Sequence, residues 1–268
     1  MRATALAFLA LLLVPAAGAD ARPGPPLEPF PYAASGEPVS DGVRYFVVTT
    51  SPTTAVVVDT VAKTARDMTI AEGCHVAGAA AAHALIACEA DGFLVDLRDL
   101  SQRQVGRFDV VGKHWLGGTR ETAGHPGAYW LNWRTGEQRS RLDANPREND
   151  VDDPQLRRRL ALEIQREPPF TLRQIPYGDL LNRRYRLVLD GPERTRLSAC
   201  RNGCQGWTLG ARLATWGEPQ TARAFDARRR VRLEWTVERR APLVVHTSRY
   251  VLVADRAELR LRWARVRR

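Results

Sequence analysis

Short apolar segments that end in Asp or Asn recur along the chain, each followed by a polar turn and a second, alternating segment. The stretch 128–142 shows the whole unit. Its apolar run ends at Asn132, a turn follows at Thr135 and Gly136, and an arginine-rich alternating run leads away. Alternation with a period of two predicts half-buried β-strands, and the turn residues between them predict hairpins. The other copies end at Asp59, Asp96, Asp190, Asp226 and Asp255.

The spacing of these copies predicts how the hairpins are assembled. Successive copies lie 37, 36, 58, 36 and 29 residues apart. A period in the high thirties with three or four short strands per copy is typical of a β-propeller, in which each copy forms one blade. We therefore expect an all-β fold, a single β-propeller of about six blades over residues 42–268. A β-sandwich or a pair of small β domains would also show alternating strands with frequent turns, and the near-constant spacing favours the propeller.

Residues 145–169 interrupt the repeat with a charged insertion. Asp152 and Asp153 precede Pro154, and apolar residues then follow at helical spacing. An acidic cap with proline in the first turn is typical of a helix start. The insertion is therefore predicted to contain one short helix.

The first 19 residues have the layout of a secretory signal peptide. Arg2 precedes an apolar run over residues 5–14, and small residues at 17–19 predict cleavage after Ala19. A retained, uncleaved anchor is the alternative. No later stretch approaches the roughly 20 apolar residues that a membrane helix needs. The sequence thus predicts a secreted or extracytoplasmic protein without a membrane span.

Residues 20–41 lie between this segment and the repeats. They contain six prolines, together with several glycines and alanines. This composition predicts an extended, poorly ordered leader.

The four cysteines form an even set in a chain predicted to be exported, where disulfides are expected. Three pairings are open, and we predict the two local ones. Cys74 and Cys88 flank strand-like sequence, and Cys200 and Cys204 enclose a turn-forming Asn-Gly. Four thiolates could instead bind zinc, but neither pair has Cys-x-x-Cys spacing and the compartment is oxidising.

The chain carries 40 Lys and Arg against 30 Asp and Glu, a formal net charge of +10. A basic surface can attract nucleic acid, acidic polysaccharide or anionic lipid. Many arginines alternate with apolar residues, as in 228–235 and 258–263. This period of two marks the solvated faces of strands, so no specific nucleic-acid partner is predicted.

Two stretches resemble a known repeat. Each shows a strand, an Asp or Asn, a turn and a Trp. The first is 131–137 (Leu-Asn-Trp-Arg-Thr-Gly-Glu), and the second is 224–227 together with 233–235. In these positions the chain resembles the PQQ-like and WD40-like propeller superfamilies over most of residues 43–266. The resemblance implies the fold and no activity, because the WD dipeptide, regular Gly and Trp docking positions and sialidase-type boxes are missing.

Motifs for catalysis are not recognisable in the sequence. The chain contains no Gly-x-Ser-x-Gly elbow, P-loop, dinucleotide fingerprint or His-Glu-x-x-His. A Ser or Cys nucleophile with a His base needs no fixed spacing, but such scattered histidines more often have no catalytic duty. We predict no catalytic residue and no cofactor. The histidines are His75, His83, His114, His125 and His246.

Two sets of oxygen-bearing side chains could in principle hold a cation. The first is a cluster in the insertion that would suit calcium; it lacks the glycine and glutamate of an EF-hand, and helix capping explains two of its members. It comprises Asn149, Asp150, Asp152 and Asp153. The second is the set of repeated Asp and Asn residues, whose places at strand ends favour turn stabilisation. No metal site is predicted.

The sequence favours a function in binding over one in catalysis. Propellers place loops around a central opening and on a broad face, which gives large binding surfaces. We expect a monomeric binding or scaffolding module for an unknown protein or cell-envelope ligand. The alternative is a hydrolase or lyase acting on a carbohydrate or envelope polymer, which would require titratable groups to converge at the opening. The tryptophans could stack on sugars, but their strand positions predict packing between blades: Trp115, Trp130, Trp133, Trp207, Trp216, Trp235 and Trp263.

Overall fold

The structure is a computed structural model. It describes residues 21–122, 125–142, 170–177, 184–192, 194–201, 205–210, 212–237, 242–255 and 258–266. These residues form β-strands and no helix. The predicted signal peptide (1–19) and the predicted helical insertion (145–169) lie outside the described residues and remain predictions.

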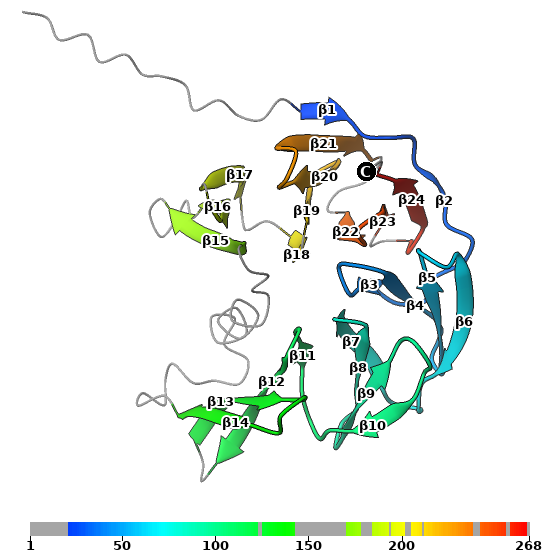
Figure 1. The fold of residues 1–268 in the computed structure, drawn as a ribbon, viewed down its shortest axis with the longest axis vertical. Coiled ribbons are helices and arrows are strands. Elements are labelled where there is room, and N and C mark those ends of the chain that lie inside the picture. Colours follow the sequence, from blue (N-terminus) through cyan, green and yellow to red (C-terminus); the bar gives the residue numbers. More distant parts are fainter. Residues whose placement is uncertain are drawn as a thin grey trace, which may run out of the picture.

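Six separate sheets surround a common axis (Figure 1). We number these blades 1 to 6 in chain order. Blade 1 contains β3 (Val39–Ser40), β4 (Tyr45–Ser51), β5 (Thr54–Asp59) and β6 (Thr64–Thr69). Blade 2 contains β7 (His75–Ala80), β8 (His83–Ala87), β9 (Gly92–Asp96) and β10 (Gln102–Gln104). Blade 3 contains β11 (Val110–Val111), β12 (Trp115–Thr122), β13 (His125–Asn132) and β14 (Gln138–Leu142).

The last three blades depart from this four-strand plan. Blade 4 shows β15 (Thr171–Tyr177), β16 (Arg184–Asp190) and β17 (Thr195–Arg201). Blade 5 contains β18 (Gln205–Leu209), β19 (Leu213–Glu218), β20 (Thr221–Asp226) and β21 (Val231–Thr236), with β1 (Ala21–Pro23) as a fifth strand. Blade 6 contains β22 (Leu243–His246), β23 (Tyr250–Ala254) and β24 (Leu261–Arg265), with β2 (Glu28–Pro29) outermost. The prediction of an all-β propeller of about six blades is confirmed.

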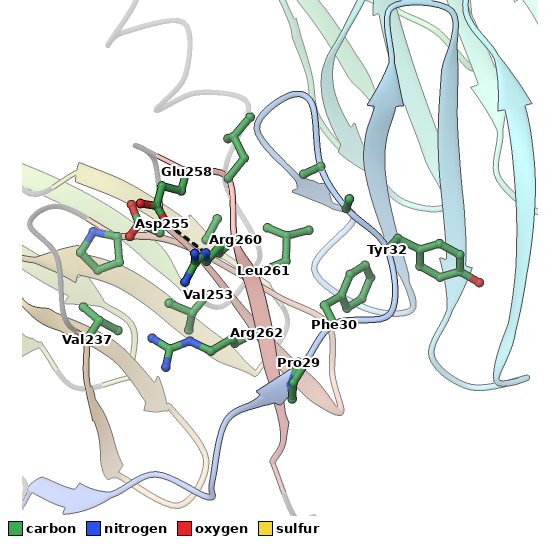
Figure 2. A pocket seen from close by; sticks show the side chains of 15 residues that line it. Pro29, Phe30, Tyr32, Val237, Val253, Asp255, Glu258, Arg260, Leu261 and Arg262 are labelled. Atoms are coloured by element: carbon green, nitrogen blue, oxygen red, sulfur yellow. Dashed lines mark ion pairs between the residues drawn. The ribbon is translucent and has the colours of Figure 1, made fainter.

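The proline-rich segment closes the ring, which corrects the expectation of a poorly ordered leader at 20–41. β1 pairs in parallel with β21, and β2 pairs antiparallel with β24. The chain then enters blade 1 as β3, so residues 21–40, which we call the closing segment, join blades 5, 6 and 1 (Figures 1 and 2). Proline suits such a segment because an outer strand needs few of its own N–H groups for pairing.

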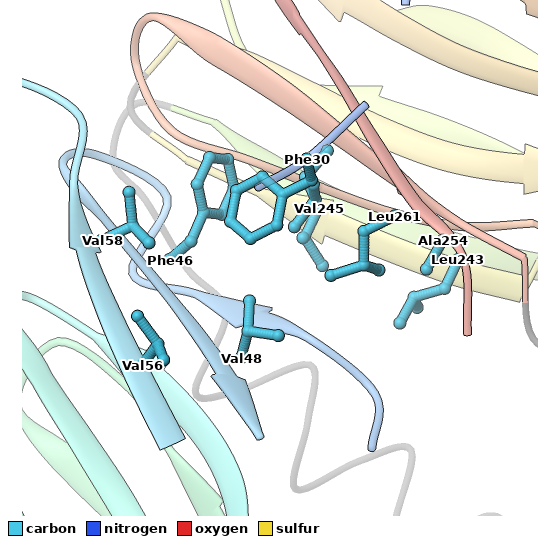
Figure 3. Close-up of a cluster of buried hydrophobic side chains, with 10 residues drawn as sticks. Phe30, Phe46, Val48, Val56, Val58, Leu243, Val245, Ala254 and Leu261 are labelled. Carbon is cyan, nitrogen blue, oxygen red and sulfur yellow. The ribbon is translucent and has the colours of Figure 1, made fainter. Parts of the chain in front are cut away.

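Blades 1, 2, 5 and 6 each bury both of their faces, because each lies between two neighbouring blades. Successive side chains of a strand point to opposite faces. In β4, Phe46 and Val48 therefore share a buried cluster with Val245 of blade 6 (Figure 3). Tyr45 points to the other face and shares a cluster with Ile86 of blade 2. This two-sided burial explains why several strands read as continuous apolar runs rather than as strict alternation.

The repeated Asp and Asn residues hold one particular turn, the one between the third and outer strands. Asp59 Oδ1 accepts the N–H groups of Val61 and Ala62, and the Asp59 carbonyl accepts that of Lys63. Lys63 has a positive φ of 58°. Asn132 and Asp226 each accept the N–H groups two and three residues ahead, and Asp96 accepts the one two residues ahead. The expected structural role is thus confirmed at these positions.

The register shows which residues are equivalent around the ring. The first residue of the second strand pairs with the last residue of the third, as in Tyr45 with Asp59 and Leu213 with Asp226. In blade 6 the equivalent pair is Tyr250 with Arg265. Asp255 instead follows β23, at the turn between the second and third strands. The assignment of Asp255 to the repeat was therefore wrong, because blade 6 takes its outer strand from the N-terminal segment.

Candidate functional site: the central cavity

A cavity of about 860 Å³ lies at the centre of the ring. Its wall includes residues of β3, β7, β11, β18 and β22, the innermost strands of five blades. Small and β-branched side chains dominate the wall and leave space along the axis. A hollow of this size with mostly apolar walls is typical of small-molecule sites. The aliphatic lining residues are Val39, Val76, Ala77, Ala79, Val110, Val111, Leu243 and Val245.

The cavity lies toward the end of the ring at which the inner strands begin. Residues 35–38, which lead into β3, line it, as do Cys74 and His75 at the start of β7. Neighbouring strands of a blade run antiparallel, so the turns between second and third strands lie at this same end. Pro52, from that turn in blade 1, is also part of the lining. We call this end the cavity mouth.

At the opposite end, turns between inner and second strands meet closely. Gly42 has a positive φ of 75°, and a Cβ on Gly210 would lie 2.6 Å from the Gly42 carbonyl oxygen and 2.7 Å from Cε1 of His246. His246 is 1% exposed, and burial lowers the pKa of its imidazole to about 4. A neutral imidazole and two glycines therefore pack together where blades 1, 5 and 6 meet.

Titratable side chains at the mouth are few. Glu37, His75 and Asp109 line the cavity, and all three are exposed. Within the described ranges, no three His, Cys, Asp or Glu side chains gather closely enough to hold a metal ion. General acid–base or nucleophilic chemistry needs partners within hydrogen-bond reach. The described lining is thus a largely apolar wall with a few exposed titratable groups at its mouth.

A disulfide between Cys74 and Cys88 lies beside the mouth and confirms the first predicted pair. Its Cα atoms are 4.3 Å apart. It fastens the start of the inner strand β7 to the end of β8, where His75 pairs with Ala87. The second pair, Cys200 with Cys204, remains a prediction because Cys204 lies outside the described residues.

A smaller hollow of about 370 Å³ between blades 2 and 3 contains a histidine close to a carboxylate. His83 Nε2 lies 3.7 Å from Asp96 Oδ2, and His83 Nδ1 lies 2.9 Å from the Ala81 carbonyl oxygen. Both ring nitrogens thus face oxygen atoms of the protein. Ser101 also lines the hollow, but its hydroxyl and N–H donate to Asp99 and lower the pKa of that carboxyl. The arrangement lacks the free imidazole nitrogen that a Ser–His–Asp triad requires.

A third hollow, of about 530 Å³, lies between blade 6 and the closing segment (Figure 2). Phe30 and Leu261 form part of its apolar wall, and both belong to the buried cluster between blades 1 and 6. Glu258 and Arg260 form an ion pair of 2.9 Å on its charged side. This hollow borders the ring closure and lies away from the central axis, so we assign the candidate site to the central cavity.

The remaining sequence candidates do not contribute to the cavity. Trp133, Trp216 and Trp235 are buried between neighbouring blades, as expected for packing residues. The proposed calcium cluster at 149–153 lies outside the described residues. The sequence did not identify the cavity wall, because inner strands of two to six residues carry no motif.

The fold and the cavity define a six-bladed β-propeller with a predominantly aliphatic central hollow. Solved structures similar to this chain include one from a mitotic checkpoint complex, at 10% identity with a TM-score of 0.44, covering 100% of both chains. Oligogalacturonate lyase from Vibrio parahaemolyticus matches at 10% identity and TM-score 0.44, covering 90% of this chain and 91% of its own. TolB from Acinetobacter baumannii matches at 10% identity and TM-score 0.36, covering 84% and 64%.

No protein-family model and no curated protein sequence matches the chain. The propeller assignment rests on the strand order and register described above. The resemblance to PQQ-like or WD40-like superfamilies in particular remains a prediction. No helix among the described residues is long and apolar enough to cross a membrane.

Proposed function

We propose that this protein is an exported, monomeric binding module that takes a ligand from its compartment into the central cavity. The observation that carries the proposal is the cavity of about 860 Å³, with aliphatic side chains from four blades and few titratable groups. An apolar ligand bound against such a wall would lose contact with water, which is favourable. Few charged side chains would have to be buried without a partner, which would be costly. The ligand would be a cell-envelope molecule or an apolar segment of a protein.

The proposed location rests on two features of the chain. The N-terminal layout predicts a cleaved signal peptide, and the Cys74–Cys88 disulfide is typical of proteins in oxidising compartments. The alternative, a hydrolase or lyase for an envelope polymer, has weaker support. The His83–Asp96 pair lies away from the cavity lining, and both nitrogens of His83 face protein oxygens.

Binding of a neutral apolar dye, Nile red, to the purified protein tests the proposal. Val110 belongs to none of the buried clusters but lines the cavity, so Val110→Trp should fill the hollow with little change to the core. We expect saturable binding with one dye per chain, weakened at least tenfold by Val110→Trp. The matched control is Thr69→Trp, at an exposed position on the outer strand β6, which should leave the dissociation constant unchanged.

Thermal unfolding of each variant checks that the substitution has not disturbed the fold. Absence of saturable dye binding would overturn the proposal. So would equal effects of Val110→Trp and Thr69→Trp, because the dye would then bind outside the cavity.

A further inference from the structure

The end of the ring opposite the cavity mouth carries the turns between inner and second strands and between third and outer strands. Antiparallel neighbours place both kinds of turn at one end of a blade. We call the surface they form the basic face. Its described turn residues are 41–44, 81–82, 112–114, 210, 212 and 247–249 of the first kind, and 60–63, 97–101, 133–137, 191–192, 194 and 227–230 of the second.

Cations project from this face around most of the ring. Each turn between a third and an outer strand in blades 1 to 5 contributes at least one, and blade 5 contributes three in succession. Lys113 comes from a turn between an inner and a second strand. The exposed cations of these turns are Lys63, Arg98, Lys113, Arg134, Arg194, Arg228, Arg229 and Arg230.

The carboxylates at the ends of the third strands are recessed behind the cations, whereas Asp99 and Glu137, within two of the turns, are exposed. The side chain of Asp96 is 18% exposed and that of its partner Arg98 is 63% exposed. The corresponding values are 27% for Asp190 and 67% for Arg194. Asp59, Asp96 and Asp226 accept backbone N–H groups within their turns, which holds these carboxylates inward. In the described turns eight exposed cations outnumber the two exposed carboxylates, so the potential above this face is positive.

The exposed large aliphatic side chains of the described residues also lie on this face. Val43 is 45% exposed and Val61 is 41% exposed, and they belong to two turns of blade 1. Arg44 follows Val43, and Lys63 lies two residues beyond Val61. The exposed apolar positions are thus bordered by cations.

We propose that the basic face docks on an anionic lipid bilayer. A broad array of Lys and Arg around a ring fits a surface of phosphate headgroups, to which juxtaposed cations are attracted. Val43 and Val61 would enter the boundary between headgroups and acyl chains. An acidic polysaccharide fits less well, because the tryptophan of this face, Trp133, is 8% exposed and Arg134 covers its ring at 4.9 Å.

Docking in this orientation leaves the cavity mouth facing away from the membrane. The proposal concerns a surface distinct from the cavity, so it stands or fails independently of ligand binding there.

Co-sedimentation with vesicles tests the docking. The purified protein is mixed with vesicles of phosphatidylcholine alone or with phosphatidylglycerol added, at low and at physiological salt. We expect binding to the anionic vesicles only, weakened by salt. The triple variant Lys63→Glu, Arg134→Glu, Arg228→Glu, which changes three blades of the basic face, should lower the partition coefficient at least tenfold.

A control variant changes the net charge equally at exposed positions outside these turns: Arg22→Glu, Arg107→Glu, Arg260→Glu. It should retain most of the binding, and both variants should unfold at temperatures close to that of the parent. Equal losses in the two triple variants would overturn the proposal, because net charge alone would explain them. It would also be overturned by equal binding to neutral vesicles, or by face-dependent binding of a soluble polyanion such as polygalacturonate without binding to vesicles.

Discussion

The closing segment and the repeated Asp or Asn turns hold the same ring together in opposite ways. Each turn is local: Asp226 accepts N–H groups from residues two and three ahead and forms an ion pair with Arg212, fourteen residues earlier. The closing segment joins the two ends of the chain, as when Trp235 Nε1 donates to the Pro25 carbonyl at 2.7 Å. Local turns can form early and singly, whereas closure requires that the blades are already in place.

The largest expected effect comes from breaking the closure. A Cβ on Gly24 would lie 2.0 Å from Cε2 of Trp235, whose side chain is buried. Gly24→Ala should therefore displace the closing segment from blade 5 and lower the free energy of unfolding by more than about 3 kcal/mol, as overpacking and the lost contacts add. Chemical denaturation measures the change.

Gly36→Ala is the matched control within the same segment. Its Cβ would meet only the side chain of Thr49, at 3.3 Å. We expect a much smaller loss. Equal losses for the two variants would show that glycine flexibility, and not the contact with Trp235, matters at position 24.

The second comparison is between two of the repeated turns, one with a largely buried ion pair, Asp226 with Arg212, and one with an exposed arginine, Asp96 with Arg98. Burial alone would raise the pKa of Asp226, but Arg212 and the N–H groups of Arg228 and Arg229 outweigh it and hold the pKa below its usual value. Asp226→Ala leaves a largely buried guanidinium without its partner and should cost about 3 kcal/mol.

The same substitution at Asp96 should cost less. There the hydrogen bond from Arg98 is the main cause of the lowered pKa, and that guanidinium is well exposed. Its loss is therefore compensated by water. Denaturant midpoints and slopes of the two variants test this order, and a larger loss at Asp96 would contradict it.

The smallest expected effect is a dependence of stability on pH, which comes from the buried His246 where blades 1, 5 and 6 meet. Burial gives His246 a pKa of about 4 in the folded protein, against 6.5 ordinarily. Between these values the unfolded chain binds more protons, so stability falls as the pH is lowered from 6.5 toward 4. The loss should reach about 2 kcal/mol by pH 5.

A His246→Gln variant should remove this slope. Further loss below about pH 4 should remain, because the pKa values of Asp59, Asp96 and Asp226 are lowered from their ordinary value of 3.8. These carboxylates therefore stabilise the fold at pH values above 3.8, and this stabilisation is lost as they become protonated. An unchanged slope between pH 6.5 and 4 in the variant would rule out His246 as its source.

The sequence by itself determined those features that depend on near neighbours in the chain. The strand-ending Asp and Asn residues at 59, 96, 132 and 226 predicted the turns, because their side chains bond N–H groups only two or three residues ahead. Their spacing, of 36 or 37 residues between the first three, predicted the length of one blade. The Cys74–Cys88 disulfide followed in the same way, since a hairpin brings its two ends together.

Only the tertiary structure decided what depends on pairing across the ring. The prolines of residues 20–41 suggested disorder, yet β1 and β2 find partners more than 200 residues away. The same closure places Arg265 rather than Asp255 at the repeat position of blade 6. The cavity wall and the basic face could not be predicted from the sequence either. Each consists of a few residues from many blades, and no local sequence pattern indicates which residues lie together in the closed ring.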